Sequence, residues 1–189
     1  EKVPNHREPL TMEMIRALYQ RNQRDGLPPS HCNVQLYHWF VVGLALGLHR
    51  IEWCQESSSN GRSPDLSRPE IDDRDGLPRA FLLGDIDCFS RTGSRIPLAE
   101  VAHSPSRVDS CMVEWRFQKN NENGEKKKIS RSTSNPPSPH CRVESLMAIV
   151  RCRFSLAASS EAIPLAVYQK DVHTPAYITN WDVTSMLRS

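Results

Sequence analysis

Two short stretches of this chain carry residue types that could act on a phosphate group. The first is "GLHRIE" at 47–52, which closes a long apolar run, and the second is Lys119, just before a predicted β-turn. An arginine guanidinium grips phosphate oxygens as a fork, and a lysine ammonium can donate a proton. Taken alone, an Arg and a Glu at a helix end are most often solvated, and a Lys beside a β-turn is ordinary. Their meaning therefore depends on the elements that hold them.

Helical spacing of apolar residues predicts three complete helices. The first begins at Thr11, whose hydroxyl can cap free backbone N–H groups, and it stops at "RDGLPPS" (24–30). The second, over 34–55, is apolar nearly all round, so we expect it at the centre of the fold. The third covers 141–157, with its arginines off the apolar stripe.

Between the second and third helices the pattern changes to that of a small antiparallel sheet. A long charged loop (57–78) leads into an apolar strand at 79–89. Alternation predicts a strand with one buried face over 111–119. Asn123-Gly124 is a good hairpin turn, and 125–132 would be the returning strand.

The two ends of the chain complete the expected organisation. Residues 1–10 are polar and contain prolines, which indicates an N-terminal arm. Near the other end, Thr179 can cap a helix that has Asp182 at the capping-box position. The order predicts an α+β fold, in which helices pack around a small antiparallel sheet as one domain over 11–189.

Composition narrows the function classes only a little. The chain has 189 residues, 38% of them hydrophobic, and a net charge of +2, which neither demands nor excludes a nucleic-acid partner. No apolar run reaches the roughly 18 residues of a membrane span, and no secretion pattern opens the chain. Because it starts with Glu1 rather than Met, we expect a processed, trimmed or partial product.

The cysteines give no support to a metal or cofactor site. Six are present, but none forms a CxxC pair, so we expect no metal and no cofactor. Reduced, mostly buried thiols are the simpler interpretation. They indicate an intracellular compartment, the nucleus if the host is eukaryotic.

Considered together and in order, several stretches resemble the catalytic domain of tyrosine recombinases (phage-integrase-like enzymes). "LALGLHRIEWCQ" resembles the family's first box, Gly-x-Arg-x-x-Glu at the end of a buried helix. "REPLTMEMIRAL", "AFLLGDIDC", "VEWRFQKNNENGEKKKIS" and "CRVESLMAIVRCR" resemble its first helix, a following strand, the hairpin with the catalytic Lys, and the next helix. The likeness is closest to recombinase-like reading frames of eukaryotic mobile elements, and it covers nearly the whole chain.

The resemblance implies a specific chemistry. In this family a tyrosine attacks a DNA phosphodiester, two arginines hold the non-bridging oxygens, and a hairpin lysine protonates the leaving oxygen. By resemblance, Lys119 would be the general acid and Glu52 the supporting carboxylate. His49 stands where the first Arg belongs, and Arg50 comes one place later. On a helix that shift turns the side chain by about 100°.

The nucleophile has no counterpart at the family's position. The His-x-x-Arg box and the nucleophilic Tyr follow the segment resembling "ITNWDVTSMLR", so all four tyrosines precede that point: Tyr19, Tyr37, Tyr168 and Tyr177. We therefore expect a truncated recombinase catalytic domain, related to DNA recombination and integration, without strand cleavage. Weak, salt-sensitive binding of duplex DNA is expected through its basic residues. These are Arg50, Arg116, Lys119, Lys126, Lys127 and Lys128.

Two alternatives stay open. The first is a non-catalytic DNA-binding or protein-interaction module repurposed from a mobile element. The second is an unrelated small α+β domain, which a sheet far from the central helix would favour. A half-domain would also expose the apolar faces of the helices at 34–55 and 141–157, and a second protein or chain would then cover them.

Overall fold

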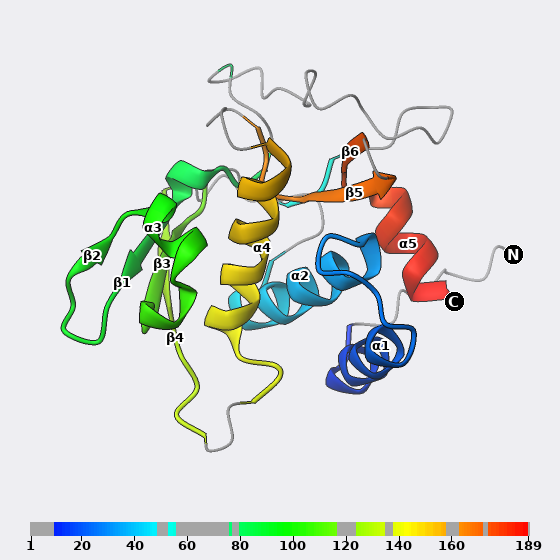
Figure 1. Cartoon of the computed structure of the whole chain (residues 1–189), viewed down its shortest axis with the longest axis horizontal. Coiled ribbons are helices and arrows are strands. Elements are labelled where there is room, and N and C mark those ends of the chain that lie inside the picture. The colour runs from blue at the N-terminus through cyan, green and yellow to red at the C-terminus, as the bar shows by residue number, and fades with distance from the viewer. Residues whose placement is uncertain are drawn as a thin grey trace, which may run out of the picture.

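The computed structural model describes residues 10–48, 53–55, 76, 80–116, 124–134, 138–157, 163–171 and 174–188. Across this part of the chain it contains five α-helices, a four-stranded antiparallel sheet and a two-stranded hairpin (Figure 1). The predicted α+β fold is confirmed. The sheet and the short helix α3 (Leu98–His103) lie at one side, helix α4 crosses the middle, and α1, α2, α5 and the small hairpin lie beyond it (Figure 1).

Helix α1 (Met12–Arg24) begins where the sequence predicted. The Thr11 hydroxyl accepts a hydrogen bond from the Met14 backbone N–H at 3.3 Å and so caps the first turn. Ile15 and Leu18 lie buried on one face of the helix, which is the apolar stripe that its spacing indicates. This helix packs against α2.

Helix α2 (Cys32–Leu46) is shorter than the predicted helix over 34–55. Gly47 adopts a left-handed conformation with φ +75°, and the N–H groups of Gly47 and Leu48 both donate to the Gly43 carbonyl, at 2.8 and 2.9 Å. Glycine favours this conformation because it has no Cβ, so the helix stops there. The prediction of a helix was wrong at 47–48 and 53–55, and the predicted helical residues 49–52 lie outside the described residues.

The sheet has the strand order β2-β1-β3-β4, with every neighbouring pair antiparallel. Its strands are Ile86–Phe89 (β1), Arg95–Ile96 (β2), Ser110–Glu114 (β3) and Lys126–Ser130 (β4). Two predicted strands are shortened at one end. The strand at 79–89 begins only at Ile86, because Leu83–Asp85 forms a 3-10 turn, and within the described residues the strand predicted over 111–119 ends at Glu114.

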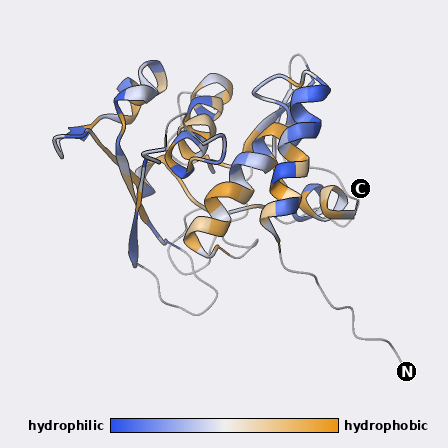
Figure 2. Ribbon diagram, turned by 90° about the horizontal axis from the view of Figure 1, so that it is seen from below, coloured by the Kyte–Doolittle hydropathy of each residue, from blue (hydrophilic) through white to orange (hydrophobic). Residues whose placement is uncertain are grey.

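The two faces of this sheet differ in polarity. The core face carries Cys88, Ile96, Cys111, Val113 and Ile129, all of them buried. The opposite face, here called the outer face, carries at the intervening positions the charged side chains of Asp87, Arg95, Glu114, Lys126 and Lys128. Figure 2 shows apolar residues gathered on the central helices and hydrophilic residues along the outer strands.

Helix α4 (Arg142–Ala157) connects the sheet to the rest of the core. It packs against α2, the short helix α3 (Leu98–His103) and β4. His38 on α2 lies 3.2 Å from the Ser145 hydroxyl on α4, and burial lowers the pKa of His38 to about 4. Arg153 is fully buried and donates to the Ile163 carbonyl at 3.2 Å, although its sequence position predicted a place off the apolar stripe.

A second hairpin, which the sequence did not predict, packs against α2. It consists of β5 (Val167–Asp171) and β6 (Thr174–Tyr177), and it leads into α5 (Asn180–Arg188). The Thr179 N–H donates to Asp182 at 2.8 Å and the Asp182 N–H donates to the Thr179 hydroxyl at 3.4 Å. This is the capping box that the sequence predicted.

The described helices are better covered than a half-domain would predict. In the described part of the chain, Leu44 is the one large exposed hydrophobic residue of α2, at 45% exposure, and α4 has none. The expected exposure of their apolar faces was therefore wrong. The other two exposed large apolar side chains of the described residues, Trp181 and Leu187, lie on α5.

Candidate nucleic-acid interface

The β3–β4 hairpin meets the end of α2. The Lys127 ammonium donates to the Leu46 carbonyl at 3.3 Å, and it lies 4.8 Å from the ring centroid of buried Trp115. It is also 4.0 Å from Glu125. The last carbonyls of a helix lack partners within the helix and carry partial negative charge, so a lysine is well placed there. Lys127 thus joins the hairpin to the segment where the first box begins.

A cluster of aromatic side chains packs next to both segments. Trp39 on α2 stacks on Trp53 with ring centroids 5.0 Å apart and on Phe81 at 6.3 Å. Phe81 in turn contacts Trp115 edge-to-face at 6.1 Å. Trp53 follows the first box directly, and Trp115 precedes the hairpin turn. Both predicted catalytic segments therefore leave from one rigid aromatic platform.

The four predicted catalytic residues lie outside the described residues. These are His49, Arg50, Glu52 and Lys119. What the structure does place is one flank of each segment, Leu46 and Lys127, in direct contact. The register argument for Arg50 assumed a continuous helix, and Gly47 ends that helix before His49 is reached.

Arg116, predicted to bind DNA, is held by an acidic partner. Its guanidinium donates from Nε and from a terminal nitrogen to the two carboxylate oxygens of Asp85, at 3.3 and 2.5 Å. The side chains of Asp85 and Arg116 are 5% and 25% exposed. Burial raises the pKa of Asp85, while Arg116 and the Leu82 N–H, which donates at 2.7 Å, oppose that rise. The positive charge of Arg116 therefore compensates the charge of a buried carboxylate, so the guanidinium is already engaged and is a poor candidate for binding a phosphate.

The three lysines of β4 have different surroundings. Lys126 pairs with Glu114 at 2.9 Å across the strands, and that hydrogen bond raises the pKa of Lys126. Lys127 has the core-face register of Ile129 and reaches Leu46. Lys128 is exposed on the outer face opposite Met112 and has no ion pair with any described residue. Lys128 is thus the lysine of this strand best placed to meet a phosphate.

All four tyrosines are at least partly covered. Tyr177, Tyr37 and Tyr168 are buried, and Tyr19 is half-buried with its ring 5.3 Å from that of Tyr37. The Tyr37 hydroxyl donates to the Pro139 carbonyl. Burial raises the pKa of Tyr37 and of Tyr168, which opposes formation of a phenolate. No tyrosine of this chain is presented as an exposed nucleophile.

Sequence reasoning missed the roles of Asp85 and Lys127. The role of Lys127 could have been predicted in principle. Side chains alternate between the two faces of a strand, so Lys127 lies on the same face as Ile129. The Asp85–Arg116 pair could not have been predicted, because it depends on the register between β1 and β3, which are joined by a long, irregular connection.

Comparison of the chain with protein-family models, curated proteins and solved structures finds no match. Among the described residues, no group of three or more His, Cys, Asp or Glu side chains is arranged to hold a metal ion. No helix in that part of the chain is long and apolar enough to cross a bilayer. The interpretation of the site therefore rests on the contacts within the structure.

Replacing Lys127 should loosen the hairpin from α2. We expect Lys127→Met to lower the free energy of unfolding by about 1 to 2 kcal/mol, through loss of the helix-end contact and the cation–π contact. Urea denaturation followed by circular dichroism measures this. Lys128→Met is the matched control on the same strand and should unfold at the parent's urea midpoint. Equal loss in both variants would show that the Leu46 contact carries no stability.

Removing Arg116 should create a pH-dependent defect. Because Arg116 lowers the pKa of Asp85, Arg116→Met leaves that carboxylate buried with a pKa raised further. Its ionised form is then penalised in the folded state, which costs about 2 kcal/mol or more at neutral pH. The deficit relative to the parent should shrink as the pH falls and Asp85 takes up a proton. Urea midpoints at pH 7.5 and pH 5 test this.

The matched control for that experiment is Arg95→Met. Arg95 is an exposed side chain that pairs with Asp87 on the outer face. This variant should show no recovery on acidification. A deficit of Arg116→Met that stays constant between the two pH values would contradict the proposed role of Asp85.

Proposed function

We propose that this chain binds duplex DNA through its phosphate backbone, as a non-cleaving domain of tyrosine-recombinase type. The observation that carries the proposal is the contact between Lys127 and the Leu46 carbonyl at 3.3 Å. It joins the β3–β4 hairpin to the segment that resembles the first box. Those two segments cooperate on one phosphate in the family that the sequence resembles, so their adjacency supports the proposal.

The arrangement of helix and sheet also supports the proposal over an unrelated α+β domain. A central helix, buried on nearly all sides, packs beside an antiparallel sheet whose last strand reaches its C-terminal end. A sheet far from this helix would have favoured the unrelated domain. The contact of β4 with the end of this helix therefore supports the proposal.

The charges available for DNA are few. Arg116 is engaged by Asp85 and Lys126 by Glu114, whereas Lys128 has no described acidic partner. Each phosphate contact contributes by releasing counterions, so binding with few free cations is weak and disappears at moderate salt. This is the expected behaviour of a sequence-tolerant backbone contact.

Strand cleavage is not part of the proposed function of this chain. Its four tyrosines are buried or half-buried, and a buried phenol hydrogen-bonded to a carbonyl cannot attack a phosphodiester of bulky duplex DNA. His49 also replaces the arginine whose fork would hold the phosphate oxygens. The proposed chemistry is therefore recognition alone.

DNA binding should be weak and steep in salt. We expect a footprint of about three phosphates, for which the logarithm of the binding constant falls with a slope of about −3 against the logarithm of salt. Lys128→Gln should reduce the magnitude of that slope by about 1. Fluorescence anisotropy of a labelled random-sequence duplex, titrated at several KCl concentrations, measures both quantities.

Lys170→Gln is the control for this titration. Lys170 is an exposed lysine on β5, at the other side of the molecule from the sheet (Figure 1). Lys170→Gln removes the same charge as Lys128→Gln and should leave the slope of the salt dependence unchanged. Absence of binding at 20 mM KCl would overturn the proposed function, and equal losses in the two variants would remove β4 from the interface.

No covalent protein–DNA adduct should form. The test incubates the chain with nicked duplexes from a randomised library, in which release of a short strand traps any phosphotyrosine intermediate. Gel electrophoresis in SDS should show free protein only, because no exposed tyrosine is available. An SDS-resistant adduct that maps to a tyrosine peptide would refute the claim that this chain does not cleave DNA.

A further inference from the structure

A groove of about 580 Å³ lies between helices α1 and α2 and the connection from β4 to α4. It begins at Ser130, the last residue of β4, whereas the proposed DNA-binding hairpin lies at the other end of the same strand. Its volume falls within the range typical of small-molecule sites. Lys128 lies only two residues before Ser130, so what distinguishes the groove from the surface discussed above is its lining from α1 and α2.

One wall of the groove is apolar. It consists of Met12 from α1 and of Val41, Leu44 and Ala45 from α2. Leu44 is 45% exposed, although nearly every other apolar residue of α2 is buried. Leu44 belongs to the lining of the groove, where an apolar ligand surface could cover it.

The rest of the lining is basic. It includes Arg16, one turn after Met12 on α1, together with Arg131, His140 and Arg142, and no described carboxylate belongs to it. The hydroxyl-bearing residues Ser132, Thr133 and Ser138 lie among them. Burial and the nearby Arg16 charge both lower the pKa of His140, which indicates positive potential in the groove. A site lined by arginines and hydroxyls without acidic side chains is suited to an anion.

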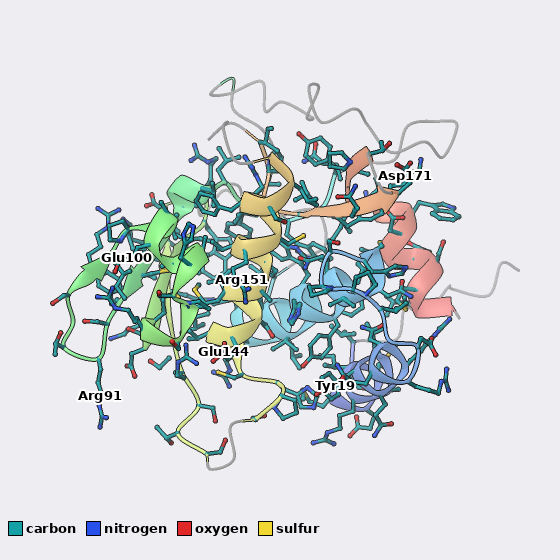
Figure 3. The ribbon with its side chains drawn as sticks, in the orientation of Figure 1. Tyr19, Arg91, Glu100, Glu144, Arg151 and Asp171 are labelled. Atoms are coloured by element: carbon teal, nitrogen blue, oxygen red, sulfur yellow. The ribbon has the colours of Figure 1, made fainter. Side chains whose placement is uncertain are left out.

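The three arginines differ in what else they bind. Arg131 donates to the carbonyls of Val108 and Pro105, at 2.7 and 2.9 Å, and pairs with Glu144 at the start of α4 (Figure 3). It is therefore a structural support of the wall. Arg142 is exposed with no ion pair to a described residue, and Arg16 has only a loose, exposed contact with Glu13 at 3.8 Å. Two guanidinium groups remain for a ligand.

We propose that this groove binds a small phosphomonoester that carries an apolar moiety, of about the size of a mononucleotide. A phosphomonoester has a charge of about −1.5 to −2 at pH 7, which matches two guanidinium groups. Its three terminal oxygens can accept from two forks and from neighbouring hydroxyls, whereas a carboxylate has only two oxygens. The apolar moiety would lie on the wall formed by Leu44 and Val41.

The described residues of the connection from β4 to α4, 131–134 and 138–141, are joined by hydrogen bonds. The Ser134 N–H donates to the Ser132 hydroxyl at 3.3 Å, and the Ser138 N–H donates to the Ser134 hydroxyl at 3.2 Å. The His140 N–H donates to the Ser138 hydroxyl at 3.2 Å, and the Ser132 N–H contacts the Cys141 sulfur at 3.3 Å. These hydrogen bonds fix Ser132, Ser134 and Ser138 before a ligand arrives, which lowers the entropic cost of binding.

Isothermal titration with four probes tests the proposal: AMP, adenosine, ribose 5-phosphate and inorganic phosphate. We expect AMP to bind most tightly. Adenosine should bind at least about tenfold more weakly, because it lacks the charge-assisted hydrogen bonds. Ribose 5-phosphate and inorganic phosphate should also bind more weakly, because they leave the apolar wall uncovered. Adenosine matching AMP, or inorganic phosphate matching AMP, would overturn the proposed ligand class.

Matched arginine variants locate the site. Arg142→Gln and Arg16→Gln should each weaken AMP binding by about tenfold, and Arg142→Lys should fall between the first variant and the parent because it keeps charge but not the fork. Arg91→Gln is the control, since Arg91 projects from the far edge of the sheet (Figure 3). Circular dichroism melts confirm that the variants fold. An unchanged affinity in Arg142→Gln, or equal weakening in Arg91→Gln, would overturn the assignment.

A competition experiment separates this site from the proposed DNA surface. Random-sequence duplex DNA at saturating concentration should leave AMP binding unchanged, and Arg142→Gln should leave DNA anisotropy unchanged. Displacement of AMP by DNA would place the groove within the DNA surface and overturn a separate small-ligand site. Because the titrations with AMP need no DNA, their outcome is independent of whether the DNA-binding proposal holds.

Discussion

The fold depends on the need to bury a helix that has almost no polar face. Helix α2 has apolar side chains around nearly its whole circumference, so leaving any side in water would cost free energy in proportion to the exposed area. Helices α1, α4 and α5, the β5–β6 hairpin and strand β4 surround it. These elements are positioned by their contact with this helix.

The C-terminal end of α2 contacts the β3–β4 hairpin. A buried helix end leaves carbonyl groups without partners, and such groups are costly in an apolar surrounding. Lys127 satisfies one of them, the Leu46 carbonyl, while its ammonium also lies over Trp115. The interaction that stabilises the end of the helix therefore also fixes strand β4 beside Leu46, the last residue of α2.

The periodic elements could be predicted from the sequence, and the contacts between them could not. Caps such as Thr11 and the Thr179–Asp182 box are local hydrogen bonds, so composition and spacing were sufficient. Helix α2 was predicted too long because apolar residues continue past Gly47, and the cost of extending through a glycine is small beside that signal. The β5–β6 hairpin was missed because its strands are short and its pairing contains an irregularity after Gln169.

The candidate site shows the same limit at the level of charge. Sequence identifies basic residues but not their partners, and the partner decides whether a cation is available to a ligand. Arg116 offsets a buried Asp85, and Arg131 supports a loop through two carbonyls, yet both are arginines in a basic chain. Lys128 and Arg142, by contrast, have no described acidic partner.

Strand β4 relates the two proposed binding regions physically. Its first residues face the hairpin and its last residue, Ser130, opens the groove, while its core-face residues Lys127 and Ile129 are fixed against α2 and the sheet. A strand anchored by the buried Ile129 and by the contact of Lys127 with Leu46 cannot transmit large displacements along its length. The two regions should therefore bind independently, and any coupling would require the aromatic platform of Trp39, Trp53 and Trp115 to repack, which is costly in a core of closely packed rings.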